Sequence, residues 1–237
     1  MTIRTPWASF DGQLIVSCQA AEDDPLRDPM IMVALARAAS LGGAAGLRAN
    51  GPDDIAAIRV AVDVPLIGLQ KRVYRGIQCI TPTIADAGAL VAAGASIVAV
   101  EATVQREELT RYEDIDHFAT LARRIHADLG AAVLADISTV DEALDAVEQG
   151  ADLVATTLAG YTPDSPPRDE PDLSLVRDLA RRLSVPVIAE GHIWTPDQAS
   201  AALDAGAFAV VVGSAITRPR LLTERFVRTL HDRALKG

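Results

Sequence analysis

The chain alternates between two kinds of apolar segment. Short runs that are almost continuously apolar, such as QLIVSC in residues 13–18 and GAAVLAD in residues 130–136, have the length of strands. Longer segments between them, such as PMIMVALARAASLGG and TVDEALDAVEQGA, place apolar residues at helical spacing. Because continuous apolarity indicates a sheet that is covered on both faces, the strands are expected to pair in parallel.

A recurrent phrase marks where helices give way to strands. In it a helical segment ends at a glycine, which can stop a helix in the left-handed conformation, and a short apolar stretch follows. The four copies are LGGAAGLRA, AAGASIVAVEAT, EQGADLVATT and DAGAFAVVVGS. Two further runs, VPLIGLQ and VPVIAE, follow a Val-Pro pair and bring the strands to eight. Eight alternating units predict one α/β domain over residues 1–237, a single TIM-type (β/α)₈ barrel, with a doubly wound open sheet as the alternative.

Composition and charge narrow the classes of partner. The formal net charge is −10, which argues against nucleic acid as a partner because phosphate backbones require a basic surface. No apolar run is long enough to span a membrane, and the N-terminus lacks the order of a signal peptide, so we expect a cytoplasmic protein. The two cysteines, Cys18 and Cys79, sit in apolar contexts and are expected to be reduced core residues.

The sequence offers no convincing metal-binding set. His117 and His126 lie in a helical stretch with charged neighbours, and His231 is close to the C-terminus. Only His192 follows a predicted strand. We therefore expect chemistry without a metal.

Polar residues follow nearly every predicted strand. In a barrel the carboxyl ends of the strands meet at one rim, which is where active sites form, and the long loop YTPDSPPRDEPD would lie at the same rim. In chain order the rim positions are Gln19, Arg48, Lys71, Glu101, Asp136, Thr156 with Thr157, Glu190, and Gly213 with Ser214. The polar residues at the eight strand ends predict a single converging site, in which Glu101, Thr156 and Thr157 are also expected to bind the substrate.

Two of these residues suit proton transfer. Lys71 ends a hydrophobic run, and loss of hydration there would lower the pKa of its amine and make it a base near neutral pH. In the same dry mouth Glu190 would tend to keep its proton and act as an acid. Such a pair fits removal of a proton next to a carbonyl. The structural alternative for Lys71 is a salt bridge to Glu101 or Asp136.

The last two predicted strands indicate a phosphate site. VVVGSAITRP places Gly213 and Ser214 after the eighth strand, where barrels commonly bind phosphate through backbone N–H groups. Gly191 follows the seventh strand and would complete the cup. Arg218 would add a charged clamp.

Seven stretches together resemble one family. They are LIVSCQ, LRANGPDDI, VPLIGLQKR, LADISTVDEAL, VATTLAGYTPDSP, VPVIAEGHIWTP and VVVGSAITRP, in order from about Gly12 to Arg225. They look like the successive signatures of the N-acetylmannosamine-6-phosphate 2-epimerases. That resemblance implies a TIM-type barrel that interconverts N-acetylmannosamine 6-phosphate and N-acetylglucosamine 6-phosphate at C2 without a cofactor, in the breakdown of sialic acid and amino sugars.

The resemblance also implies roles for individual residues. The family's catalytic lysine and glutamate fall on Lys71 and Glu190, its polar substrate contacts on Gln19, Arg48 and Asp136, and its phosphate contacts on Gly191, Gly213, Ser214 and Arg218. This chain departs from the family's usual residues at three positions, with Gln70 for isoleucine, Glu101 for aspartate and His192 for arginine.

Other functions compatible with the same residues are a Schiff-base aldolase using Lys71 and a sugar-phosphate-binding barrel without catalysis. The expected partner is a small sugar phosphate. The apolar helix PMIMVALARAA also allows a homodimer.

Overall fold

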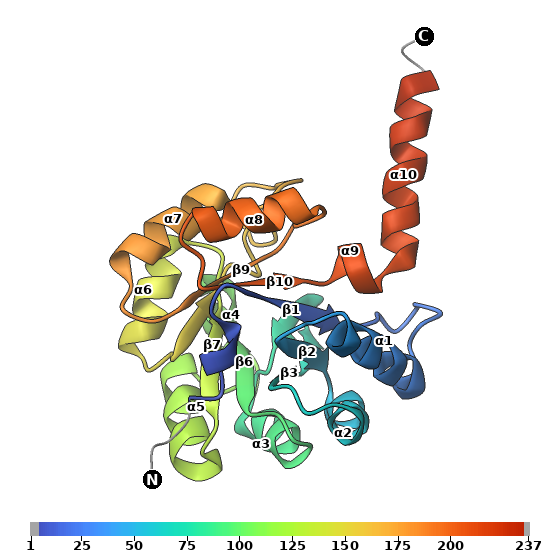
Figure 1. Cartoon of the computed structure of the whole chain (residues 1–237). Helices are drawn as coiled ribbons and strands as arrows, with labels where there is room; N and C mark the ends of the chain where they lie inside the picture. The colour runs from blue at the N-terminus through green and yellow to red at the C-terminus, as the bar shows by residue number, and fades with distance from the viewer. Residues whose placement is uncertain (1–4, 235–237) are drawn as a thin grey trace.

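The computed structural model describes residues 5–234 and forms a closed barrel of parallel strands surrounded by helices (Figure 1). The barrel strands are β1 (Gln13–Cys18), β2 (Gly46–Asn50), β3 (Leu66–Leu69), β6 (Ile97–Glu101), β7 (Ala132–Asp136), β8 (Leu153–Ala155), β9 (Val187–Glu190) and β10 (Ala209–Val212). They neighbour each other in this order, and β10 pairs with β1 to close the ring. The TIM-type barrel is therefore confirmed, and the open doubly wound sheet is excluded.

Helices follow the strands around the outside of the barrel. They are α1 (Pro29–Leu41), α2 (Pro52–Ala61), α3 (Ile84–Ala92), α4 (Val104–Leu109), α5 (Phe118–Arg124) continued by the π-turn η2 (Ile125–Leu129), α6 (Val140–Glu148), α7 (Leu173–Arg182), α8 (Pro196–Asp204), α9 (Ser214–Thr217) and α10 (Pro219–Ala234). Thr139 and Thr195 open α6 and α8 with complete capping boxes, which satisfy backbone N–H groups at the helix starts. Over residues 5–234, no helix has the length and apolarity needed to cross a membrane.

The apolar residues of the strands alternate between the barrel interior and the layer between strands and helices, which consists of two clusters. On β3, Ile67 and Leu69 point into the barrel, whereas Gly68 faces outward, where a Cβ would lie 2.7 Å from Ile55. Phe10, from the short 3₁₀-helix η1 (Ala8–Phe10), fills the end of the barrel at which the strands begin and packs in the interior cluster. Because the interior is packed with side chains, the open end for a ligand is the rim at the carboxyl ends of the strands.

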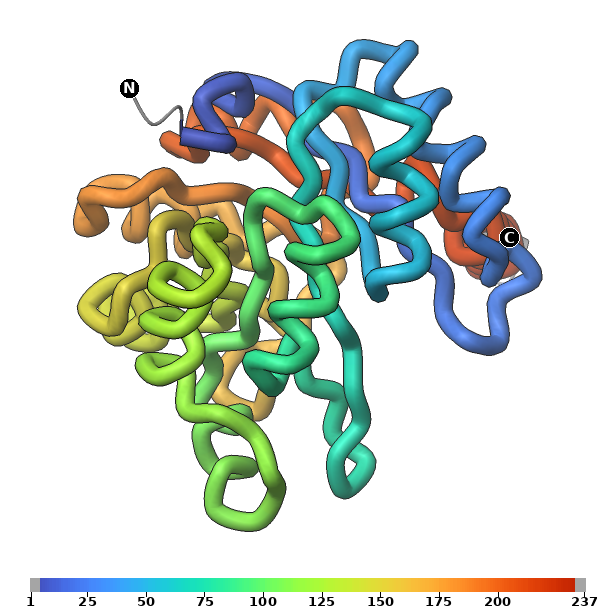
Figure 2. Tube along the Cα trace, turned by 90° about the horizontal axis from the view of Figure 1, so that it is seen from below, coloured from blue at the N-terminus to red at the C-terminus, as the bar shows by residue number. Residues whose placement is uncertain are grey.

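A hairpin absent from the sequence prediction follows β3. Strand β4 (Lys71–Tyr74) pairs with β5 (Ile77–Ile80) in antiparallel fashion, and Lys71 lies opposite Ile80. The expectation that Lys71 ends the third barrel strand is therefore wrong, because β3 ends at Leu69 and Lys71 begins the hairpin. The bend is fixed by side chains, since Asn50 accepts the Lys71 N–H (2.9 Å) and Thr81 accepts the Gln70 N–H (3.1 Å). In Figure 2 the hairpin projects from the barrel beside the segment that follows β6.

Helix α10 stands away from the barrel, as Figure 1 shows. Three apolar side chains on it are exposed: Phe226 by 65%, Val227 by 45% and Leu230 by 63%. Its first turn is linked to the loop after β1, because Arg220 donates to Asp23 at 3.1 Å.

Candidate active site

A cavity of about 650 Å³ opens at the carboxyl ends of the barrel strands. Its lining includes all of the predicted site residues except Asp136 and Thr156, namely Gln19, Arg48, Lys71, Glu101, Thr157, Glu190, Gly191, Gly213, Ser214 and Arg218. These residues come from strands and loops spread along most of the chain. The barrel therefore brings the sequence-predicted groups into one site.

Arg48 is the hub of the charged groups. From the middle of β2 its guanidinium donates to both oxygens of Asp136 on β7, at 2.9 and 2.6 Å, and to Glu190 at the end of β9, at 2.7 Å. The exposed fractions of the Arg48 and Asp136 side chains are 1% and 0%. A bidentate contact of this kind fixes the guanidinium in position as well as compensating charge.

Thr157 completes this network. Its hydroxyl lies 2.5 Å from Asp136 and 3.2 Å from Glu190, so it bridges the two carboxylates that share Arg48. Asp136 lies beneath Arg48 and Thr157 and is not part of the cavity wall. Asp136 therefore orients the residues that line the cavity.

Lys71 lies in the cavity wall without a fixed counter-ion. Among residues 5–234, no carboxylate lies within ion-pair distance of its amine, so the predicted alternative of a salt bridge to Glu101 or Asp136 is not formed. Burial lowers the pKa of Lys71 below its ordinary value, and the positive charge of Arg48 lowers it further. Both effects increase the fraction of neutral amine, the form that can accept a proton.

Glu190 is perturbed in the opposite direction. Burial raises the pKa of Glu190 to about 7, although the charge of Arg48 opposes the rise; the negative charge of Asp136 adds to it. Its side chain is 12% exposed, so it borders the cavity. A carboxyl group with this pKa exchanges protons at neutral pH.

Two side chains that were predicted to bind the substrate are already hydrogen-bonded to other groups of the protein. Glu101 accepts the Ile80 N–H at 3.1 Å and the Thr103 hydroxyl at 2.7 Å, so it fastens the hairpin to β6 although it also lines the cavity. Thr156 is bonded to the main chain of Glu190 in both directions, at 2.9 and 3.1 Å. Thr156 therefore aligns β8 with β9 and does not reach the cavity.

The predicted phosphate residues gather at one end of the cavity, after β9 and β10. Gly191 adopts φ +103°, a conformation that favours glycine, and Gly213 packs so closely that a Cβ would lie 3.1 Å from Ser17. The Thr217 hydroxyl donates to the Ser17 carbonyl at 2.7 Å and thereby holds α9 against β1. Arg218 follows α9 and also lines the cavity.

Gln19 has one buried polar atom without a hydrogen-bond partner within residues 5–234. Its amide nitrogen donates to the Ser17 hydroxyl at 2.7 Å, whereas its buried carbonyl oxygen has no hydrogen-bond partner within residues 5–234. An unpartnered buried acceptor is costly unless a ligand supplies a donor.

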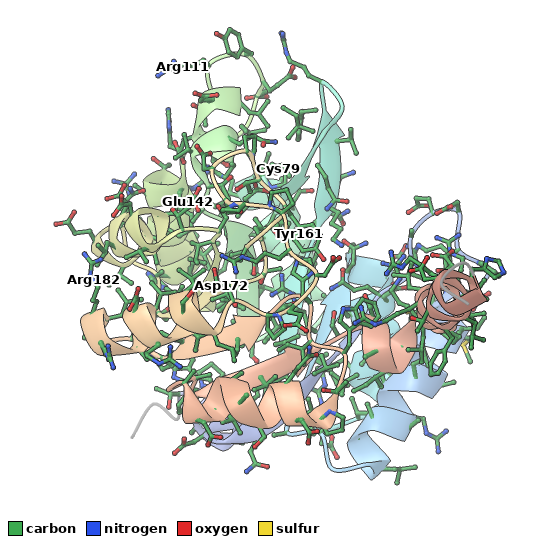
Figure 3. The ribbon with its side chains drawn as sticks, turned by 90° about the horizontal axis from the view of Figure 1, so that it is seen from above. Cys79, Arg111, Glu142, Tyr161, Asp172 and Arg182 are labelled. Atoms are coloured by element: carbon green, nitrogen blue, oxygen red, sulfur yellow. The ribbon has the colours of Figure 1, made fainter. Side chains whose placement is uncertain are left out.

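Several cavity residues were not found from the sequence. Tyr161 and Trp194 line the cavity, and the ring of His192 stacks on that of Tyr161 at 4.6 Å. Figure 3 labels Tyr161, which lies on the long loop after β8. His192 adopts φ +57° and one of its ring nitrogens lies 3.2 Å from the Ala159 carbonyl, so its ring is held by this contact as well as by the stack on Tyr161. The Tyr161 loop did carry a sequence signal, because it follows a strand at the active rim.

The two thiols lie outside the chemistry of the site. Cys18 and Cys79 are buried and free, and burial raises the pKa of each to about 12. Neither is a thiolate at neutral pH. Over the described residues no three His, Cys, Asp or Glu side chains are grouped to hold a metal ion, and a metal-free reaction remains a prediction.

The chain matches a known family over most of its length. A family model described as "Putative N-acetylmannosamine-6-phosphate epimerase" matches residues 32–232. A protein of Caldanaerobacter subterraneus named "Putative N-acetylmannosamine-6-phosphate 2-epimerase" is 48% identical, with 94% of this chain and 93% of the relative covered. A protein of the same name from Cutibacterium acnes is 45% identical over 92% of this chain and 94% of its own.

Solved structures show the same fold. The N-acetylmannosamine-6-phosphate 2-epimerase from Clostridium perfringens superposes with a TM-score of 0.90 at 39% identity, covering 97% of this chain and 98% of that one. Thiamine phosphate pyrophosphorylase from Pyrococcus furiosus has a TM-score of 0.59 at 19% identity, covering 88% of each chain, and shares the fold alone.

Proposed function

The chain belongs to the N-acetylmannosamine-6-phosphate epimerase family, and from this premise we propose that it interconverts N-acetylmannosamine 6-phosphate and N-acetylglucosamine 6-phosphate by moving a proton at C2. The observation that carries the proposal is the opposite perturbation of two groups in one cavity, a lysine whose pKa is lowered and a carboxyl group whose pKa is raised. Proton removal and return require such a base and acid.

The charges of the network support this assignment. Arg48 is shared between the carboxylates of Asp136 and Glu190, and the pKa values of Lys71 and Glu190 are shifted toward each other. Moving one proton from Lys71 to Glu190 leaves the total charge of the cavity unchanged. The pair can therefore present a neutral amine and a protonated acid together without adding a buried charge.

In the proposed reaction the open-chain sugar places C2 next to the C1 aldehyde. The Lys71 amine removes the C2 proton, and the negative charge that develops on O1 is stabilised by the nearby Arg48 guanidinium. Glu190 serves as the acid for reprotonation on the opposite face, which inverts C2. Arg48 is already held in place before substrate arrives, so no reorganisation is needed during the reaction.

The phosphate would bind to residues that follow β9 and β10, namely Gly191, Gly213, Ser214 and Arg218. Binding energy from this remote group would orient C2 between base and acid. The unpartnered carbonyl oxygen of Gln19 would accept a sugar hydroxyl.

Incubation of the protein with N-acetylmannosamine 6-phosphate in deuterated water tests the proposal. The expected product, detected by NMR, is the C2 epimer with deuterium at C2. Lys71→Ala is expected to lower kcat by about 10²- to 10⁴-fold, the usual contribution of a positioned base. A folded protein that yields neither epimer nor exchange would overturn the proposal.

The same samples distinguish the alternative functions. A Schiff-base aldolase would give a covalent adduct at Lys71 after borohydride reduction. A barrel that only binds sugar phosphates would bind the substrate in calorimetry without deuterium exchange.

We further infer that the protein acts as a homodimer in the cytoplasm. The exposed apolar residues of α10, together with Met30 and Leu41 on α1, support a second copy as the partner that covers them. The buried free thiols fit a reducing compartment. The acidic net charge of −10 supports a small-molecule partner and not a nucleic acid.

A further inference from the structure

We propose that Asp24, in the loop between β1 and α1, is the positioning residue for the phosphate-binding guanidinium of Arg218. The inference rests on the proposed function, in which Arg218 holds the phosphate of the substrate. Asp24 does not line the cavity itself, whereas Arg218 does. Its role is therefore exerted through Arg218.

The carboxylate of Asp24 is buried and only half used. The side chain is 2% exposed, and its Oδ1 accepts the Leu26 N–H at 3.0 Å, which shapes the loop. Its Oδ2 has no hydrogen-bond partner within residues 5–234. That oxygen instead lies 3.8 Å from Nη2 of Arg218 and 3.8 Å from Nε of Arg220.

These separations attract charge without consuming donors. A distance of 3.8 Å is an ion pair but is longer than a hydrogen bond, so Asp24 draws Arg218 into place while leaving its N–H groups available. The Arg218 side chain is 25% exposed at the cavity wall, where a phosphate could accept from it.

Arg220 provides the reason for a carboxylate at this position. Two guanidinium groups approach the same oxygen of Asp24 and would repel each other without its charge. Asp23 pairs with Arg220 at 3.1 Å but makes no ion pair with Arg218. Arg220 is thus compensated from two sides, and Arg218 depends on Asp24 alone among the ion pairs of the described residues.

Asp24→Asn tests the proposal because it removes the charge and keeps the acceptor for Leu26. The KM for N-acetylmannosamine 6-phosphate is expected to rise about tenfold, the scale of one lost charge-assisted contact, while kcat stays within about twofold. The kcat/KM for unphosphorylated N-acetylmannosamine should not change. A merely structural role would affect both sugars alike.

Two further variants sharpen the test. Asp23→Asn is the matched control, since Asp23 is 76% exposed and contacts only Arg220, and it should leave KM unchanged. In the Arg218→Ala background, Asp24→Asn should add no further loss, because residues that act through one contact are non-additive. If Asp24→Asn does not fold, Asp24→Ser also removes the charge and keeps an acceptor.

The affinity for inorganic phosphate, measured by calorimetry, separates this proposal from the epimerase proposal. Asp24→Asn should weaken phosphate binding whether or not the wild-type protein turns over the sugar. An unchanged or lowered KM with unchanged phosphate affinity, or full additivity with Arg218→Ala, would overturn the positioning role. Failure of wild-type turnover with weakened phosphate binding in Asp24→Asn would overturn only the epimerase assignment.

Discussion

At the scale of single residues, the pKa values of Lys71 and Glu190 predict the pH profile. The reactive form needs a protonated Glu190, which is lost as the pH rises above about 7, and a neutral Lys71, which is lost as the pH falls below its lowered pKa. The profile of kcat/KM should therefore have two limbs, and the one near pH 7 should belong to Glu190. In Glu190→Gln the limb near pH 7 should disappear from the residual activity. Persistence of this limb would show that another group is responsible for it.

Arg48 predicts a stability effect at the same scale. Arg48→Met leaves the buried carboxylate of Asp136 without a counter-ion and is expected to lower the free energy of unfolding by about 3–5 kcal/mol. Arg72→Met breaks the pair with Asp86, in which the arginine is 54% exposed, and should cost no more than about 1 kcal/mol. Urea denaturation of both variants measures the difference. Equal losses would contradict the assignment of Arg48 as a buried hub.

At the scale of elements, the hairpin β4–β5 depends on Glu101. Glu101→Ala removes the acceptor of the Ile80 N–H, and leaving that buried donor unsatisfied costs about 1–3 kcal/mol. Amide hydrogen exchange in the hairpin should then become about tenfold faster or more, since about 1.4 kcal/mol corresponds to a factor of ten. Glu101→Gln keeps a carbonyl acceptor and should preserve most of the protection. Exchange that is equally slow in both variants would rule out Glu101 as the fastener.

The barrel strands could be predicted from the sequence, whereas the hairpin β4–β5 could not. Most barrel strands were predictable because they are apolar runs covered on both faces, and β2, which carries Arg48, was predictable because it follows a helix-ending glycine. The hairpin was not, since Arg72, Val73 and Gln78 are exposed and lack the continuous apolarity of a barrel strand. Its cause is tertiary, namely the bond from the Lys71 N–H to Asn50 on another strand.

The same limit applies to the site. Most of the cavity residues could be predicted from the sequence, because they follow barrel strands and the geometry of a barrel brings the strand ends together. The sharing of Arg48 between Asp136 and Glu190 joins three different strands, and no local pattern encodes it. For the same reason Thr156, which neighbours Thr157 in the chain, was not distinguished from it.

At the scale of the whole molecule, α10 determines the expected assembly. Phe226→Asp combined with Leu230→Asp places charge on the exposed apolar side of the helix and should convert a dimer into a monomer of 25.0 kDa. Light scattering after gel filtration measures the mass. Arg228→Asp, on the opposite side of the helix, is the matched control and should remain dimeric. A wild-type protein that is monomeric at high concentration would contradict the dimer.

Helix α10 also touches the site, and this contact has a practical consequence. The guanidinium of Arg225 lies 4.7 Å from the centre of the Trp194 ring, and Trp194 lines the cavity. Trp7 is the only other tryptophan in the sequence, and it packs with the residues that fill the interior of the barrel. In a Trp7→Phe background the intrinsic fluorescence would thus come from one indole placed between ligand and helix. The protein carries its own optical reporter, by which sugar binding and the arrangement of the C-terminal helix can be followed without a label.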